Sequence, residues 1–252
     1  MPSPTVINQY RYSDVINRAL WDNTYFFDNF KFQPVTAKVG GGAATGTAGD
    51  NNVLFTALNA WQWNVIGTQT ILAPSNDSFG LNLIQDNTSG DGIELCLGQD
   101  ANNPATYVIG SSNAISFEME FKVQDVSGVN PLIIGLRKVQ AFDATLANYT
   151  DFVALGIVGT AAKFQTQTQI ATGGVVTTDT TQVALDATVF RLKINVSSTG
   201  VVTYQINSQA PAVVAAYTFA NGLQIMPFIR CVEAADITTY ASTDYFSLGT
   251  QS

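Results

Sequence analysis

The sequence of 252 residues contains no histidine, only two cysteines and few charged residues, which make up 12% of the chain. The missing histidine excludes Ser-His-Asp and Cys-His catalysis, and every metal site that needs an imidazole ligand. The cysteines, Cys96 and Cys231, lie in the apolar stretches "IELCLG" and "FIRCVE". We expect both to be reduced and buried, packed as small hydrophobic residues rather than joined in a disulfide.

Basic residues are scarce, with 11 Lys and Arg against 19 Asp and Glu, so the formal net charge is −8. Binding to a nucleic-acid backbone needs clustered positive charge, and Arg137-Lys138 is the only adjacent basic pair. We therefore expect no nucleic-acid partner. A surface with so little charge also offers little repulsion between copies, which favours a homo-oligomer.

Long hydrophobic runs are absent as well. No apolar run reaches the ~18 residues that a membrane-spanning helix needs. The first residues, "MPSPTVINQYRYSD", have neither a basic region nor an apolar region of the kind found in signal peptides. We expect no membrane partner and no signal peptide, and hence synthesis in a cytoplasm.

Helical periodicity is rare, and a period of two dominates from about Val53 onward. "ISFEMEFKV" alternates apolar and polar residues, and "FRLKINVSSTGVVTYQIN" contains two alternating runs around a Ser-Ser-Thr-Gly turn. Turn signals rich in Gly, Asn, Asp and Pro separate about ten or more such runs. This pattern predicts an all-β fold, an antiparallel β-sandwich over residues 51–252, in which each sheet has one solvated face.

Residues 1–50 have a different character and are predicted to form an N-terminal arm. Helical spacing in "SDVINRALWD" predicts one short helix that begins at Ser13 or Asp14. "TAKVGGGAATGTAGDNN" predicts a flexible connector. It is not a phosphate-binding loop, because no Lys-Ser/Thr pair follows its glycines.

The arm is too short to form a core of its own, yet it carries eight aromatic residues that must be buried against something. Either the protein's own sandwich or another copy or partner can cover them. We predict that these residues form a partner-binding arm: Tyr10, Tyr12, Trp21, Tyr25, Phe26, Phe27, Phe30 and Phe32.

One pair of carboxylates has a spacing compatible with glycoside hydrolysis. Glu118 and Glu120 lie two apart on a predicted strand, hence on one face and about 7 Å apart. Lys122 follows on the same face and can neutralise them. We prefer the interpretation that this is the charged outer face of a half-buried strand, and we expect the protein not to be an enzyme.

Turn residues supply the oxygen ligands that Ca²⁺ prefers, at Asp91, Asp100, Asn102 and Asn103. The same residue types are favoured in β-turns for conformational reasons alone. We expect no metal and no other cofactor, with Ca²⁺ as the disfavoured alternative.

Three stretches resemble the concanavalin A-like (laminin G-like) jelly-roll family. "ISFEMEFKVQD" (Ile115 to Asp125) resembles its long early strand. "FRLKINVSSTGVVTYQINSQAPAVV" (Phe190 to Val214) resembles its strand–turn–strand pair, although Asn207-Ser208 stands where many relatives have Asp-Gly. "MPFIRCVEAADITTYASTDYFSLG" (Met226 to Gly249) resembles its last two strands. The resemblance, which covers roughly residues 111–249, implies the fold.

In its general style, an acidic chain with an aromatic arm and a Gly-rich connector, the sequence also resembles bacteriophage virion proteins. This resemblance implies a structural, non-enzymatic capsid decoration (cement) protein located in the virion. Such a protein would be a homotrimer that stabilises the shell through its arm and through contacts between subunits, against the major capsid protein or another virion protein. The alternative is a lectin-like carbohydrate-binding module of a phage tail or fibre, whose partner is a glycan.

If the arm anchors the protein, deletion of residues 1–50 will abolish its attachment to particles, because the buried aromatic contacts are lost. Co-sedimentation of the full chain and of the truncated chain with particles measures this. Attachment that survives the deletion would contradict the anchoring role.

Overall fold

The structure, a computed structural model, describes residues 25–28, 35–38, 51–55, 60–68, 73–74, 81–83, 88–99, 103–104, 107–159, 161–234 and 241–251. These residues form β-strands and two short 3₁₀ helices, η1 (Val126–Gly128) and η2 (Leu146–Asn148). The all-β prediction is confirmed, while the predicted helix near Ser13 lies outside the described residues. No helix in the described part is long and apolar enough to cross a membrane.

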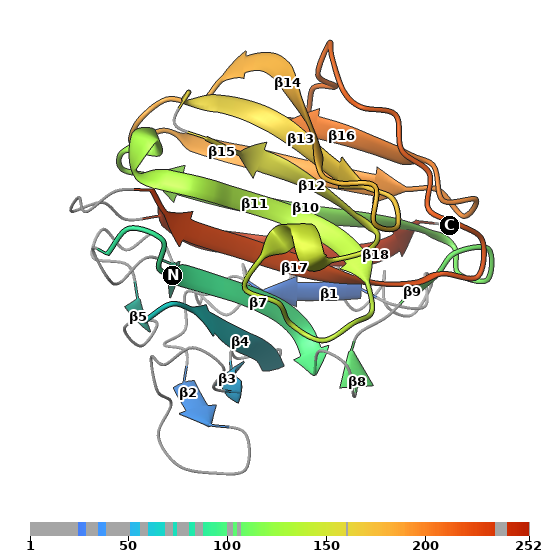
Figure 1. The fold of residues 1–252 in the computed structure, drawn as a ribbon, viewed down its shortest axis with the longest axis horizontal. Helices are drawn as coiled ribbons and strands as arrows, with labels where there is room; N and C mark the ends of the chain where they lie inside the picture. The colour runs from blue at the N-terminus through green and yellow to red at the C-terminus, as the bar shows by residue number, and fades with distance from the viewer. Residues whose placement is uncertain are drawn as a thin grey trace, which may run out of the picture.

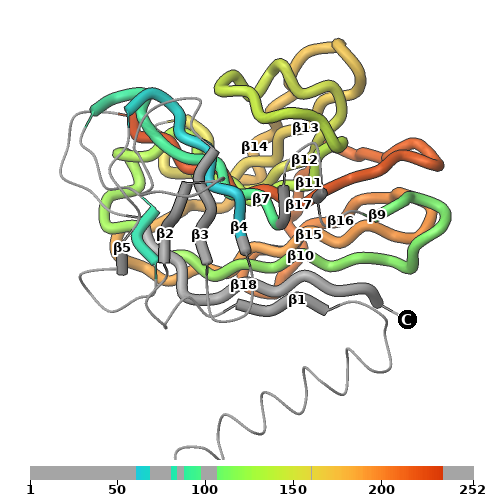
Figure 2. Tube along the Cα trace, turned by 90° about the horizontal axis from the view of Figure 1, so that it is seen from below, coloured from blue at the N-terminus to red at the C-terminus, as the bar shows by residue number. Residues whose placement is uncertain are grey.

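Two antiparallel sheets pack face to face, as the two views of the chain show (Figures 1 and 2). Within the described residues the smaller sheet has seven strands. Six of them follow one another across the sheet, and the seventh, β1, pairs with β18 outside that order. Its strands are β16 (Val202–Ile206), β15 (Val189–Val196), β10 (Ala114–Val123), β18 (Ala241–Gln251), β6 (Leu81–Asn82) and β5 (Ala73–Pro74), in that order, and β1 (Tyr25–Asp28).

The larger sheet has eleven strands in the described part, with β14 at one edge. In order they are β14 (Val176–Val183), β13 (Lys163–Gln169), β12 (Phe152–Ile157), β11 (Val129–Lys138), β17 (Gln224–Glu233), β7 (Gly92–Gln99), β4 (Ala60–Ile66), β3 (Asn51–Phe55) and β2 (Val35–Lys38). Two short strands join off this path, β8 (Asn103–Pro104) on β7 and β9 (Tyr107–Val108) on β17.

The core between the sheets follows the predicted alternation. Every second residue of β10 is buried, from Ile115 to Val123, and the intervening residues are half-exposed. The hairpin of β15 and β16 behaves in the same way, because Phe190, Leu192, Ile194 and Val196 and then Val202, Tyr204 and Ile206 point into the core. Both predicted runs therefore form the strands that their sequence pattern indicates.

The larger sheet departs from the prediction of one solvated face per sheet. All six residues of β12 are buried, and a second apolar cluster lies on the sheet face turned away from the core. Residues 139–151, between β11 and β12, cross that face and cover it (Figure 1). The strands beneath this loop are nearly continuous apolar runs such as "FVALGI", which is the pattern of strands buried on both sides.

Both cysteines are free and buried, as predicted. Cys231 points into the core between the sheets, where burial raises the pKa of its thiol above the usual value. Cys96 belongs to the second cluster, on the outer face of the larger sheet.

Gly135 lies in the middle of this outer face, and a Cβ atom there would overlap the ring of Phe228. We predict that Gly135→Ala lowers the free energy of unfolding by about 1–3 kcal/mol, because overpacking forces neighbouring side chains from their positions. Urea denaturation measures the change. Gly173→Ala is the control, since an added Cβ atom there meets only the Ile170 carbonyl oxygen, at 3.1 Å, in an exposed turn, and it should change stability by less than Gly135→Ala does. An equal loss in both variants would contradict the steric argument.

Candidate functional site

The outer face of the larger sheet is built from side chains that stand in rows across its strands. One row contains Asn64, Glu94, Arg230, Ile133, Gly156, Gln165 and Asp179. The next contains Gln62, Cys96, Phe228, Gly135, Ala154, Gln167 and Thr177. The centre of both rows is apolar and their ends are polar. The outer face therefore has an apolar centre with polar side chains on either side of it.

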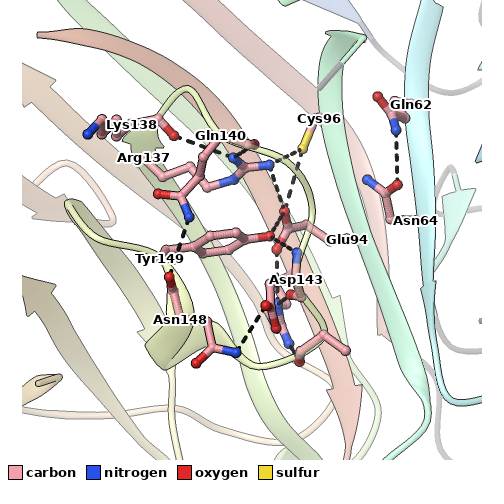
Figure 3. A network of polar contacts seen from close by, with 12 residues as sticks. Gln62, Asn64, Glu94, Cys96, Arg137, Lys138, Gln140, Asp143, Asn148 and Tyr149 are labelled. Atoms are coloured by element: carbon pink, nitrogen blue, oxygen red, sulfur yellow. Dashed lines mark hydrogen bonds and ion pairs between the residues drawn. The ribbon is translucent and has the colours of Figure 1, made fainter. Parts of the chain in front are cut away.

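A charge cluster lies at one side of the apolar centre. Glu94, Arg137 and Tyr149 meet there (Figure 3), and Arg230 joins them through its ion pair with Glu94. Glu94 Oε1 lies 3.2 Å from Arg137 Nη2, and Glu94 Oε2 lies 3.0 Å from Arg230 Nη1. The side chains of Glu94 and Arg137 are fully buried, and that of Arg230 is 4% exposed. Glu94 therefore bridges two arginines that come from β11 and β17.

Tyr149 completes the cluster from loop 139–151. Its hydroxyl donates to Glu94 Oε1 at 2.7 Å, and its ring lies under the Arg137 guanidinium, with Cζ 4.3 Å from the ring centroid. Burial, and then the negative charge of Glu94, raise the pKa of Tyr149 well above its usual value. The hydroxyl therefore keeps its proton and acts as a donor to the carboxylate.

The two arginines bind loop 139–151 through its backbone. Arg230 donates from Nη1 to the Asp143 carbonyl oxygen at 3.1 Å and from Nη2 to the Ala144 carbonyl oxygen. Arg137 Nη1 donates to the Gln140 carbonyl oxygen at 2.7 Å. The cluster thus holds the loop against the sheet, and Tyr149 packs edge-on against Phe228 in the apolar centre. In this arrangement the charge cluster therefore serves to position loop 139–151.

The opposite side of the apolar centre carries what we call the amide strip: Gln165, Gln167 and Gln169 of β13, with Thr177 and Asp179 of β14. Glutamines at every second position share one face of β13. Gln169 and Gln167 are 3% and 9% exposed, whereas Gln165 is half-exposed and Thr177 is exposed. The strip therefore runs from the buried margin of loop 139–151 out to solvent at the sheet edge.

Within the described part of the chain, the amide nitrogens of Gln167 and Gln169 are bound, but their oxygens are not. Gln169 Nε2 donates to the carbonyl oxygens of Ala147 and Ala171, and Gln167 Nε2 donates to Thr177 Oγ1 at 3.3 Å. The buried oxygens Gln167 Oε1 and Gln169 Oε1 have no hydrogen-bond partner within the described part of the chain. Both oxygens are almost fully shielded from solvent, so the surface that the strip offers to a ligand lies at Gln165 and Thr177.

At the exposed end of the strip, Asp179 is paired with Lys163, and Oδ2 lies 2.6 Å from Nζ. The hydrogen bond from Lys163, followed by one from the Thr181 backbone N–H, lowers the pKa of Asp179. The strip therefore presents neutral amides and a neutralised ion pair rather than net charge.

Glu118 and Glu120 lie on the outer face of the smaller sheet, far from both the charge cluster and the amide strip. Arg191 and Lys193 of the neighbouring β15 face them, with Arg191 Nε 3.3 Å from Glu118 Oε1 and Arg191 Nη2 2.8 Å from Glu120 Oε2. The preferred interpretation, a charged outer face, is confirmed. The neutralising cations that we identify come from the adjacent strand, whereas the sequence had pointed to Lys122.

The other predicted site residues are only partly described. The backbone of Tyr25, Phe26 and Phe27 lies in β1, which pairs with β18, and the remaining arm aromatics lie outside the described residues. Among the four proposed Ca²⁺ ligands, Asp91 closes a turn through its backbone N–H and the Thr88 carbonyl oxygen. Asp100 and Asn102 fall outside the described residues.

Sequence reasoning missed both the charge cluster and the amide strip. The alternation in "GIELCLG" already placed Glu94 opposite the core, and "KFQTQTQ" repeats glutamine with a period of two. Both signals were available. What the sequence did not show was that a loop distant in the chain covers Glu94 and turns a surface carboxylate into a buried one.

No family model matches the chain, and no curated protein matches it. Solved structures do. The carbohydrate recognition domain of Emp47p is 9% identical, with a TM-score of 0.51 over 76% of this chain and 89% of that one. A structure described under endo-acting O-glycanases, expressed by members of the human gut microbiota to initiate mucin breakdown, is 9% identical, with a TM-score of 0.52 over 90% and 99%. At such identities the likeness shows the fold, a concanavalin A-like jelly-roll sandwich.

We predict that Glu94→Gln lowers the free energy of unfolding by about 3–5 kcal/mol, because two buried arginines lose the carboxylate that bridges them. Urea denaturation checks it. The control is Glu118→Gln, whose partly exposed ion pairs on the smaller sheet contribute about 0–1 kcal/mol. Similar losses in the two variants would show that the cluster does not stabilise the fold in this way.

Proposed function

We propose that the protein is a carbohydrate-binding β-sandwich that binds a glycan on the amide strip of its larger sheet. One observation carries the proposal: the amides of Gln165, Gln167 and Gln169 stand in line along β13 beside Thr177 of β14, and Gln165 and Thr177 are accessible to a ligand. Sugar hydroxyls are both donors and acceptors. A chain of hydroxyl groups can therefore bind along the accessible side chains at the end of this row.

The strip suits a neutral hydroxylated ligand better than an ion. Its members are amides, a hydroxyl and a carboxylate already neutralised by Lys163. Small-molecule sites typically contain a few amide and hydroxyl groups whose hydrogen bonds fix the orientation of the ligand. Because the strip follows β13 and β14 across several residues, we expect an oligosaccharide rather than a single sugar.

Loop 139–151 supplies the wall beside the strip. The Ala147 carbonyl oxygen is bound by Gln169 Nε2, so the loop meets the strip at its buried end. The charge cluster holds this loop in place from the other side. The loop also carries the half-exposed Phe142, an aromatic ring that can line a ligand site.

The solved structures of similar fold agree with this class of function, since one is a carbohydrate recognition domain and another is described with O-glycanases. This support is analogy at the level of the fold, and one fold hosts many functions. We propose a binding role without catalysis, because the carboxylate pair that suggested hydrolysis is engaged with Arg191 and Lys193.

The second reading, a phage capsid decoration protein in the virion, stays a prediction. It depends on residues 1–50, and the arm's side chains lie outside those that the structure describes. The carbohydrate-binding alternative rests instead on described residues, so we place it first.

The test is a glycan array that spans neutral, acidic and amino sugars, followed by calorimetry on any hit. We expect the wild type to bind an oligosaccharide and Gln165→Leu to weaken it by about 5-fold to 100-fold, the range for one or two lost hydrogen bonds. The larger end applies if the leucine also leaves a sugar hydroxyl unpaired.

Gln205→Leu is the matched control, because Gln205 is a half-exposed glutamine on the smaller sheet and the substitution is identical. It should leave affinity unchanged, and thermal unfolding should confirm that both variants fold. An array without any binding would overturn the proposal. If neither substitution changes the affinity, the glycan binds at a place other than the amide strip.

A further inference from the structure

We infer that β14 is an open sheet edge that pairs antiparallel with β14 of a second copy of this chain, joining two larger sheets into one. The inference goes beyond the proposed function and is independent of any glycan. It starts from the position of β14, which ends the larger sheet and pairs only with β13 among the described strands (Figure 1).

The smaller sheet shows how this fold treats an edge that must stay unpaired. The outer side of β16 is covered by the segment that follows it: Val202 N donates to the Tyr217 carbonyl oxygen, and Phe219 N donates to the Gly200 carbonyl oxygen. Bridges at Val201–Thr218 and Ile206–Gln209 continue this cover. Uncovered edges are a recognised route to association, and proteins usually protect them in this way. The described part of the chain gives β14 no such cover.

Exposed apolar side chains gather along the same edge. The described residues contain eight large hydrophobic side chains that are strongly exposed, and four of them lie on β14 or in the segments that enter and leave it. Val176 and Val183, at the two ends of β14, are 56% and 58% exposed. The four are Ile170, Val176, Val183 and Leu185. A partner along this edge would remove them from water.

The composition of β14 favours pairing. Its sequence, "VTTDTTQV", is rich in β-branched residues and lacks the lysine or proline that blunts many natural edges. Its pairing with β13 is regular from Val176 to Asp179, and a bulge follows near Thr181, which has a positive φ of 68°. The available stretch is therefore the first half of the strand.

Charge favours a second copy as the partner. Charged residues make up only 12% of the chain, so two copies repel each other weakly despite the net charge of −8. On β14 the single charged residue, Asp179, is already paired with Lys163 of its own chain. A two-fold axis brings together two uncharged edges of the same length in antiparallel order, which is what strand addition requires. This gives the expected homo-oligomer a two-fold form in place of the predicted trimer.

The arrangement has a consequence for the outer face. The local two-fold axis of an antiparallel strand pair is perpendicular to the sheet, so residues on one face stay on that face in both copies. Thr177 and Asp179 belong to the amide strip. The strips of the two copies would therefore adjoin across the new strand pair and form one continuous surface.

Sedimentation velocity of the full chain between 1 and 100 µM tests the inference. We expect a concentration-dependent species of twice the 26.9 kDa monomer mass. Thr177→Lys/Thr178→Lys should shift it to monomer, because antiparallel pairing of residues 176–179 would bring four lysines together across the edge. Ser198→Lys/Thr199→Lys adds the same charge to the exposed turn between β15 and β16 and should stay dimeric. Circular dichroism should show that both variants fold.

Hydrogen exchange of the wild type at the two concentration limits locates the contact. Backbone amides of β14 should exchange at least several-fold more slowly at 100 µM than at 1 µM, and those of β16 should not change. A wild type that is monomeric at 100 µM overturns the inference. So does a dimer that survives the β14 lysines, or one whose β14 amides keep the same rate, since another surface would then make the contact. Both measurements omit glycan, so a failed glycan array leaves them unaffected.

Discussion

The arrangement of the larger sheet depends on one buried carboxylate. Glu94 bridges Arg137 and Arg230, and the two guanidiniums in turn bind backbone carbonyl oxygens of loop 139–151. Without that loop, the apolar centre formed by residues such as Ile133 and Phe228 would face water. Two buried cations with one anion are costly to desolvate, and hydrogen bonds to carbonyls offset much of that cost. The charge and the loop therefore require each other: the loop shields the arginines, and the arginines hold the loop.

This mutual dependence divides the outer face into regions with separate tasks. Beneath the loop, apolar packing such as that of Tyr149 on Phe228 stabilises the sheet. Beyond the loop, the amide of Gln165 on β13 and the hydroxyl of Thr177 on β14 reach solvent instead. A polar strip at the margin of a fixed wall is held more rigidly than one on an open sheet. Rigid placement reduces the ordering cost of ligand binding, so the charge cluster supports the amide strip without touching it.

The sequence predicted the sandwich well because its signals are local. Alternation in β10, β15 and β16 directly reports which side chains face the core, and the structure confirms each of these strands. The charge cluster could not be read in the same way. Glu94, Arg137 and Arg230 are each unremarkable in sequence, and only strand order brings β7 next to β17 and β17 next to β11. The cover of Glu94 by Tyr149 spans 55 residues of chain, and no period within a strand encodes it.

The two edges of the sandwich, as far as the structure describes them, explain why the proposed dimer would also affect the proposed glycan site. At β16 the chain covers its own edge, and the core residues Tyr217 and Phe219 are buried by the same segment. At β14 the hydrogen-bonding edge and the amide strip are adjacent, so a partner that completes the sheet also widens the polar face. A glycan long enough to contact the amide strips of both copies would bind the second strip at an effective concentration set by the rigid strand pair rather than by a flexible linker. Weak individual hydrogen bonds to hydroxyls then add across the pair, which is how modest sites reach useful affinity on repeated ligands.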